Sequence, residues 1–332
     1  MKAVVQTGYG SPDVLELREI DRPVPGGGDI LVRVQAASLH AGDYFGLRGS
    51  PFAARMTIGL FRPRANYIPG LDAAGTVETV GRNVTRLRPG DEVFGSVSGA
   101  CAEYACAAED SLVPKPVNVT FEQAAASPTS GLTALLGVRD AGKVQPGQKV
   151  LINGASGGVG TFAVQIAKAL GAEVTGVCST ANVDTVRSIG AEHVVDYTKE
   201  DFAQGDKRYD LILDNIASRS FSDLRRVLTP RGRVIPNSGH GGMRYVVKAF
   251  LLSVFVRQQG SMFVSLPKHA DLVVLRELME SGRVTPVVDR TYPLEEVPEA
   301  FRYLLQGHAR GKVVITVGGN GDSDTQDRSA EA

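Results

Sequence analysis

The sequence predicts an α/β fold in which a doubly wound parallel sheet of the Rossmann type is joined to a second, mainly β region. Three features support this prediction. Short apolar runs separated by Gly and Pro fill the chain up to about residue 120, and strand and helix patterns alternate after that point. Residues 147–168 place a strand, a glycine-rich turn and a helix in direct succession.

In the first region, Gly and Pro mark the ends of the expected strands. Pro23, Pro25 and the run Gly26–Gly28 separate two of them, and the Arg88–Asp91 segment forms a turn before another. We therefore expect this region to be all-β in character. The strands are expected at residues 3–6, 14–20, 30–37, 75–80, 92–94 and 102–106.

The second region alternates strands and helices, which predicts a parallel sheet built from crossover units. Strands are expected at residues 149–153, 173–178, 193–196, 210–214 and 233–235, and helices at 160–170, 182–189 and 219–228. After about residue 266 we expect a helix at 270–281, a strand at 284–289, a helix at 295–306 and a strand at 312–317. The last residues are small and polar, as in a loose tail.

Composition limits the partners and the compartment. With 332 residues, 43% of them hydrophobic, the chain can bury a substantial core and favours two domains. Lys plus Arg and Asp plus Glu both number 36, which favours a small-molecule partner over nucleic acid or an anionic membrane. Cys101, Cys106 and Cys178 lack CxxC spacing, and the first residues lack a charged-then-apolar leader. We therefore expect a cytoplasmic protein in a reducing compartment.

The glycine-rich turn has the features of a dinucleotide site. It follows the apolar strand Val150–Ile152, although Ala155 replaces the first glycine of the usual GxGxxG pattern. Gly157 leaves room for backbone to approach a diphosphate, Gly160 lets helix and strand pack closely, and the N–H groups of the helix start favour an anion. The residues expected to bind the dinucleotide here are Ala155, Ser156, Gly157, Gly158, Val159 and Gly160.

This segment resembles the signature of the quinone oxidoreductase branch of the medium-chain dehydrogenase/reductase family, and the resemblance extends to about Val317. The residues that carry it are Gly147, Gln148, Leu151, Ala155, Ser156, Gly157, Gly158, Gly160, Gln165 and Lys168. The resemblance implies a discontinuous GroES-like catalytic domain of residues 1–122 and 267–318. It also implies a Rossmann domain of residues 123–266 and a flexible tail of residues 319–332.

The end of the second Rossmann strand favours NADPH as the cofactor. An Asp or Glu there would bind the ribose hydroxyls of NADH and repel a 2′-phosphate, but this chain has neither. Ser179, Thr180 and Asn182 can instead donate hydrogen bonds to a phosphate. Alternatively, Ser179 and Thr180 cap the next helix. The nearest basic residue is Arg187.

The resemblance adds further residues around this cofactor. It implies that Tyr197 lies near the adenosine end, and that Asn215, Ile216 and Ser238 line the nicotinamide side. The carboxyl ends of parallel strands are where a ligand is expected in such a sheet.

We expect no bound metal. Zinc-dependent alcohol dehydrogenases of the same family use a Cys after the third strand, a His in a GHE motif and a further Cys or acid. This chain has the segment Ala37–Asp43 at the first position, Leu71 at the second, and no thiolate in Ser127–Gly131. His40 and Asp72 are possible ligands, but a catalytic zinc usually has three.

Without a Lewis acid, reduction is the easier reaction. Hydride addition to a quinone or to the β-carbon of an enone leaves negative charge on an oxygen, which hydrogen-bond donors can stabilise. His40 stands where relatives carry the Asn of an N-P-x-D motif, with Asp43 matching its Asp. We assign His40 and Tyr44 as catalytic candidates, with Tyr67 as a further donor. Alternatively, His40 is satisfied by backbone and Tyr44 faces outward.

The apolar segment Met243–Phe263 is too short, and too interrupted by Lys248 and Arg257, to span a bilayer. Three interpretations remain, in order of preference: a core or dimer-interface helix, a cover over the substrate cleft, or a peripheral membrane contact. Because the family often dimerises through an edge strand, which residues 262–265 can provide, we expect a homodimer.

Taken together, the sequence predicts an NADPH-dependent, zinc-independent oxidoreductase that reduces quinones or α,β-unsaturated carbonyl compounds. One alternative is an alcohol dehydrogenase with an unconventional metal site. Another is a non-catalytic protein that binds or senses NADPH.

Overall fold

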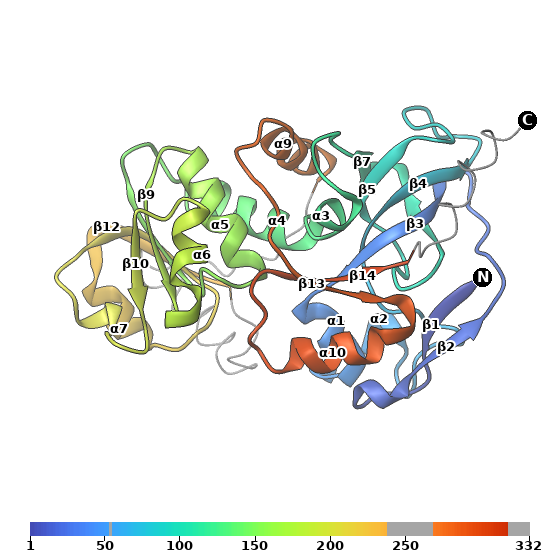
Figure 1. Ribbon diagram of the computed structural model, residues 1–332, viewed down its shortest axis with the longest axis horizontal. Helices are drawn as coiled ribbons and strands as arrows, with labels where there is room; N and C mark the ends of the chain where they lie inside the picture. The colour runs from blue at the N-terminus through green and yellow to red at the C-terminus, as the bar shows by residue number, and fades with distance from the viewer. Residues whose placement is uncertain (53–54, 238–267, 318–332) are drawn as a thin grey trace, which may run out of the picture.

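The computed structural model describes residues 1–52, 55–237 and 268–317 of the chain. The predictions for Ser238, for the segment Met243–Phe263 with its edge strand, and for the tail lie outside these residues. In Figure 1 a parallel sheet lies at the left and a larger sheet at the right, with helix α4 (Pro128–Leu135) between them.

The parallel sheet confirms the predicted fold class. Its strand order is β10-β9-β8-β11-β12, and every pairing within it is parallel. The chain moves outward from β8 on one side and then continues with β11 on the other, so the strand order reverses between β8 and β11. The strands are β8 (Lys149–Asn153), β9 (Glu173–Cys178), β10 (His193–Asp196), β11 (Tyr209–Asp214) and β12 (Leu228–Pro236).

The larger sheet joins the two ends of the described chain. Its order is β13-β14-β3-β4-β5-β7, and β6 also pairs with β3. The pairing of β14 with β3 is antiparallel and brings Val313 opposite Leu39. Its strands are β3 (Asp29–Leu39), β4 (Asp72–Val80), β5 (Glu92–Ser96), β6 (Tyr104–Ala108), β7 (Leu112–Pro114), β13 (Val288–Pro293) and β14 (Lys312–Thr316); β1 (Lys2–Gln6) and β2 (Leu15–Glu19) form a separate antiparallel pair.

Two helices correct the expectation of an all-β first region. Helix α1 (Ala41–Arg48) begins at a capping box formed by His40 and Asp43 and ends at Gly49, whose φ of 60° suits a residue without a Cβ. The short helix α2 (Arg55–Ile58) follows it. Helices of eight and four residues are too short to give a clear periodic signal in the sequence.

The strand expected at residues 284–289 begins later, at Val288. Pro286 has no N–H to donate to a ladder, and the N–H and C=O of Thr285 bond to the Gln165 side chain at 2.7 and 3.0 Å. The remaining helices are α3 (Phe121–Ala125), α5 (Gly158–Ala169), α6 (Val183–Ser188), α7 (Phe221–Arg226), α9 (His269–Glu280) and α10 (Val297–Leu305), with a π-turn η4 (Leu136–Ala141) and single 3₁₀ turns η1 (Pro12–Val14), η3 (Glu109–Ser111), η5 (Thr180–Asn182), η6 (Phe202–Gln204) and η7 (Leu294–Glu296).

The core beneath the glycine-rich turn is formed by the apolar stripe of α5. Phe162, Ala163, Ile166 and Ala167 are fully buried and belong to the same hydrophobic cluster as Ile152 of β8. Burying one large apolar side chain contributes about 1.5–3 kcal/mol. The packing therefore holds the start of α5 firmly against the end of β8.

Candidate active site

The glycine-rich turn joins β8 to the open end of α5. Gly157 is the N-cap residue of α5 and makes no side-chain cap, so the first N–H groups of this helix are not satisfied by a capping side chain. A Cβ on Gly160 would lie 2.0 Å from the carbonyl oxygen of Gly154, whereas a Cβ on Gly157 would have no heavy atom nearer than 3.5 Å. Gly160 is therefore required by packing, whereas a Cβ on Gly157 would make only an ordinary contact with Gly154. These features fit the diphosphate of a dinucleotide.

Polar side chains join the strand ends where the strand order reverses. Asn153 at the end of β8 donates to Asp214 at the end of β11, with a 2.8 Å bond. The Asn215 amide donates to the Asn153 carbonyl and accepts from Asn237, at 3.0 and 2.6 Å. Ile216 is 48% exposed at this edge. Asn215 and Ile216, which were predicted to line the nicotinamide side, thus lie at the carboxyl ends of β8, β11 and β12.

Ser179 and Asn182, which were predicted to bind a 2′-phosphate, come together with Ser156 of the glycine-rich turn. The Asn182 amide nitrogen lies 3.2 Å from the hydroxyls of both Ser156 and Ser179, and it donates to them. The side-chain oxygen Oδ1 of Asn182 is buried and has no hydrogen-bond partner in the part of the chain that the structure describes. Tyr197 is 57% exposed. Arg187, the nearest basic residue in the sequence, lies 3.9 Å from Asp184.

Thr180 is engaged by a residue that sequence reasoning missed. Its hydroxyl donates to Asp196 at the end of β10, with a 2.5 Å bond. The hydrogen bonds from Thr180 and from Thr198 hold the pKa of the Asp196 carboxyl well below its usual range. The alternative that Ser179 and Thr180 cap the next helix is wrong, because neither η5 nor α6 has a side-chain cap. Asp196 directly precedes Tyr197, which was predicted to lie near the adenosine end, and this neighbourhood could have indicated Asp196 from the sequence.

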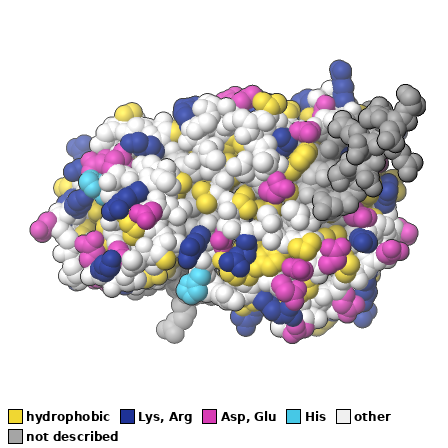
Figure 2. Space-filling model, viewed as in Figure 1, with side chains coloured by type: hydrophobic (Ala, Val, Ile, Leu, Met, Phe, Trp, Pro, Cys, Tyr) yellow, Lys and Arg dark blue, Asp and Glu magenta, His cyan; other side chains and the backbone are white. Residues whose placement is uncertain are grey.

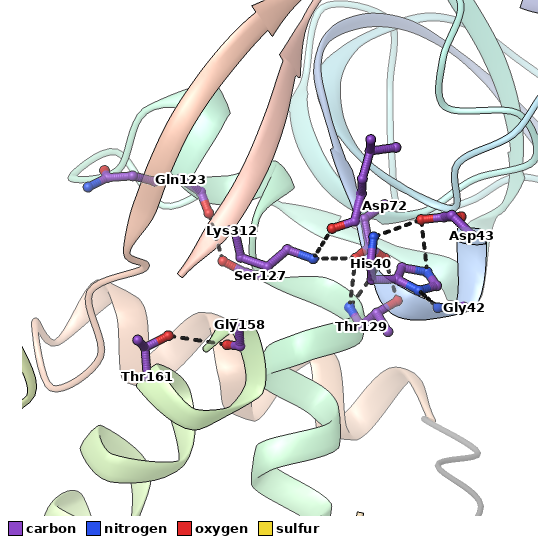
Figure 3. Close-up of polar contacts among 11 residues, drawn as sticks. His40, Gly42, Asp43, Asp72, Gln123, Ser127, Thr129, Gly158, Thr161 and Lys312 are labelled. Carbon is purple, nitrogen blue, oxygen red and sulfur yellow. Dashed lines mark hydrogen bonds and ion pairs between the residues drawn. The ribbon is translucent and has the colours of Figure 1, made fainter. Parts of the chain in front are cut away.

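A second group of polar residues forms around Asp72, the first residue of β4 (Figure 3). Asp72 is fully buried and accepts hydrogen bonds from the Thr129 backbone N–H and from its hydroxyl, the latter at 2.7 Å. The ammonium of Lys312 lies 3.9 Å from Asp72 and donates to the Leu39 carbonyl at 3.0 Å. We call His40, Asp43, Asp72, Thr129 and Lys312 the Asp72 cluster.

Burial changes the ionisation of this cluster. Lys312 is 2% exposed, and its desolvation lowers the pKa of its ammonium, which Asp72 and then Asp43 counteract. Desolvation raises the pKa of the Asp43 carboxyl, although the proximity of His40 opposes the shift. Sequence reasoning did not select Lys312 or Thr129. A lone Lys at the start of the apolar strand Lys312–Thr316 was the only signal for the former.

His40 has one satisfied and one unsatisfied ring nitrogen. Its Nδ1 accepts from the Gly42 N–H at 2.9 Å, and its backbone N–H donates to Asp43 at 2.9 Å. Because Nδ1 accepts, the proton of the neutral ring is on Nε2. Nε2 is shielded from solvent and has no hydrogen-bond partner among the described residues; Asp43 is 3.5 Å away. The alternative that backbone satisfies this histidine therefore holds for Nδ1 only.

The two tyrosine candidates differ in their surroundings. Tyr44 lies on α1, where its hydroxyl accepts from Arg48 at 2.7 Å. Tyr67 is partly buried, and desolvation together with the nearby Asp43 charge raises its pKa to about 12. Tyr67 therefore remains a neutral O–H donor at physiological pH.

Comparison with known proteins identifies relatives along nearly the whole chain. Residues 26–117 match the alcohol dehydrogenase GroES-like domain, and residues 189–315 match the zinc-binding dehydrogenase domain. The chloroplastic quinone-oxidoreductase QR1 of Triphysaria versicolor is 31% identical and covers 95% of this chain and 98% of its own. The NADPH-dependent alkenal/one oxidoreductase of Arabidopsis thaliana is 33% identical, with 95% and 79% coverage. The solved quinone oxidoreductase of Coxiella burnetii has a TM-score of 0.83 at 29% identity and covers 96% of this chain and 99% of its own.

The residues around Asp72 do not match a usual zinc site, although one matched domain is described as zinc-binding. Both Asp72 oxygens face the Thr129 N–H, and one also faces the Lys312 ammonium. Leu71, at the position of the GHE histidine, has no donor atom. Among the described residues, no group of three His, Cys, Asp or Glu side chains could hold a metal ion.

Proposed function

We propose that this chain, which belongs to the quinone oxidoreductase branch of the medium-chain dehydrogenase/reductase family and is an NAD(P)H-dependent oxidoreductase, uses NADPH in its reaction. Its acceptors are quinones or α,β-unsaturated carbonyl compounds, and the reaction needs no zinc. NADPH supplies the hydride. The protein's own residues bind the cofactor, orient the acceptor and stabilise the charge that develops on its oxygen.

The observation that carries this proposal is Nε2 of His40, which makes no hydrogen bond among the described residues and has the Asp43 carboxylate 3.5 Å away. Hydride addition to a quinone or an enone places negative charge on the carbonyl oxygen, and a fixed N–H donor stabilises that charge. Gly42 sets the ring tautomer, so the donor is already in place before the acceptor binds. Removing one such donor typically lowers kcat by about 10²–10³. Tyr67, a neutral O–H near Asp43, is a second donor for the same oxygen.

The preference for NADPH is supported by the Ser156–Asn182–Ser179 group. Asn182 donates to the hydroxyls of Ser156 and Ser179, which leaves the hydroxyl hydrogens to donate to a phosphate at the end of β9, where NADH-specific proteins place a carboxylate. The carboxylate that the sequence analysis did not select, Asp196, lies at the end of the next strand, β10. It accepts hydrogen bonds from Thr180 and Thr198, and the Lys199 ammonium lies 3.3 Å away, so its negative charge is offset.

The absence of zinc from the proposed reaction is supported by the donor set around Asp72. The one cation that the described residues place beside this carboxylate is the ammonium of Lys312. The zinc-binding description of a matched domain favours one second candidate, an alcohol dehydrogenase with an unconventional metal site. The two candidates make opposite predictions about metal removal.

The experiment is an acceptor screen in buffer containing a chelator. Quinones, enones, enals and alcohols are tested separately with NADPH and NADH, using the wild type and a His40→Ala variant. We expect NADPH oxidation by a quinone or an enone, unaffected by the chelator, and a kcat lower by about 10²-fold in the variant. Activity that the chelator abolishes and zinc restores would reject this proposal in favour of the second candidate.

The homodimer, the cytoplasmic location and any peripheral membrane contact are part of the same proposal. Within the described residues, no helix is both long and apolar enough to cross a membrane. Figure 2 shows acidic and basic side chains interspersed on the visible face, which is consistent with a small-molecule substrate rather than nucleic acid. Light scattering of the purified protein tests the dimer.

A further inference from the structure

Lys312 is a buried cation that the proposed reaction does not use directly. It is 2% exposed, yet its ammonium is placed between the Leu39 carbonyl and the fully buried Asp72 carboxylate. Burying an ammonium is unfavourable unless an opposite charge and hydrogen-bond acceptors receive it. Because desolvation of this ammonium is unfavourable, packing alone does not explain why a lysine occupies this position.

The side chain of Lys312 connects the two parts of the candidate site. Its ammonium holds the carbonyl of Leu39, the residue directly before His40. Its Cδ is 3.1 Å from the position of a Cβ on Gly158, the first residue of α5. The preceding residue, Gly311, pairs with Gly157 in a parallel bridge. Lys312 thus spans from the cofactor turn to the backbone of the donor histidine (Figure 3).

We propose that Lys312 is a positioning residue that fixes His40 relative to the cofactor turn. Its hydrogen bond sets the end of β3, from which His40 enters helix α1. The charge of Lys312 offsets Asp72, while Asp43 accepts the backbone N–H of His40. The kinetic part of this inference rests on the function proposed above, whereas the placement of His40 does not.

The competing explanation is that Lys312 only neutralises Asp72. A double-variant cycle separates the two roles. Lys312→Met removes the ammonium, Asp72→Asn removes the carboxylate, and the combined variant leaves no buried charge unpaired between them. If the role is only neutralisation, the combined variant regains both stability and catalysis. If Lys312 positions His40, the combined variant regains stability but not catalysis.

Lys115 provides the matched control. Its side chain is 7% exposed, its ammonium lies 3.1 Å from Glu92, and it donates to the carbonyls of Pro116 and Val119. It therefore resembles Lys312 in side-chain burial and in having carboxylate and carbonyl partners, although Glu92 is half-exposed, and it lies after β7. Lys115→Met and Lys115→Met/Glu92→Gln report what loss of a buried lysine does by itself.

Three measurements are made on each variant. Denaturant unfolding gives stability, ¹⁵N NMR of the histidine rings in cofactor-free protein gives the His40 tautomer, and steady-state kinetics with NADPH and 4-deuterated NADPH report on hydride transfer. A His40→Gln spectrum assigns the His40 signal among the five histidines.

For Lys312→Met/Asp72→Asn we expect near-wild-type stability, an altered His40 signal, and an unchanged KM for NADPH. We also expect kcat to fall by about 10²-fold with a larger isotope effect, since small displacements of reacting groups have effects of this size. A combined variant with a wild-type His40 signal and wild-type kcat would overturn the inference. If the wild type oxidises no NADPH, the proposed function fails, and the His40 signal alone still decides whether Lys312 positions this residue.

Discussion

The glycine-rich turn and the Asp72 cluster are built in opposite ways. The turn is a continuous run in which the absence of side chains matters, since Gly160 packs against Gly154 and a Cβ on Gly157 would make no contact shorter than 3.5 Å. The cluster consists of charged and polar side chains from distant segments, and Lys312 bonds to a carbonyl 273 positions away. Changes in the turn should therefore act mainly through sterics, and changes in the cluster through unpaired charge.

The largest effect on stability should come from the cluster. Asp72→Ala leaves the ammonium of Lys312 buried without its carboxylate, and removing one partner of a buried ion pair typically costs about 3–5 kcal/mol. Denaturant unfolding measures the loss. The control is Glu92→Ala, which removes the half-exposed partner of Lys115 and should cost at most about 1 kcal/mol. Equal losses in the two variants would contradict the distinction.

A smaller but still large effect is expected in the turn. Gly160→Ala places a Cβ 2.0 Å from the Gly154 oxygen, so the backbone must shift. Overpacking of this kind costs about 1–3 kcal/mol, and we expect nucleotide binding to be lost with it. Chemical denaturation and NADPH fluorescence titration test both effects. Unchanged stability would show that the turn is less tightly packed than the structure indicates.

Gly157→Ala is the matched change that should spare the fold. Its Cβ would meet nothing nearer than 3.5 Å, so stability should stay within about 1 kcal/mol of the wild type. The added methyl group lies where the diphosphate is proposed to approach, and we expect NADPH affinity to fall about tenfold. Wild-type affinity, measured by the same titration, would place the diphosphate elsewhere.

Charge introduced near the turn should affect the choice of cofactor rather than the fold. Asn182→Asp puts a carboxylate beside Ser156 and Ser179, where it repels a 2′-phosphate. We expect the ratio of NADPH to NADH affinity to fall about tenfold, equivalent to about 1.4 kcal/mol. Asn118→Asp, far along the chain at a contact with Met279, controls for net charge. An unchanged ratio would remove Asn182 from the phosphate site.

The smallest effect concerns Tyr67 at alkaline pH. Its pKa is raised from 10.0 to about 12, so between these values the unfolded chain has lost a proton that the folded protein keeps. Stability should therefore fall as pH rises through this window, by about 1 kcal/mol after allowance for partial exposure. Tyr67→Phe should flatten that part of the unfolding curve against pH. Parallel curves for variant and wild type would show that Tyr67 is not perturbed.

Local patterns predicted the elements around the turn well. The strand expected at residues 149–153 is β8, and the helix expected at 160–170 is α5, which begins at Gly158. Prediction was poorer where a tertiary contact replaces a local one. Gln165 takes the backbone groups of Thr285 and delays β13. Prediction was also poorer at His40, where a local capping box begins a helix of only eight residues, too short for a clear periodic signal.

The sequence by itself determined the fold class and the glycine-rich turn between β8 and α5, because the residues that form the turn are neighbours along the chain and glycine acts by lacking a side chain. It also made His40 a catalytic candidate, though it did not show which of its ring nitrogens lacks a hydrogen bond. Only the tertiary structure brought Asp72, Thr129 and Lys312 together and paired Thr180 with Asp196. The physical reason is that a buried charged or polar group is stable only beside its partners. These partners are far apart in the sequence and become neighbours through the pairing of β14 with β3 and of β10 with β9.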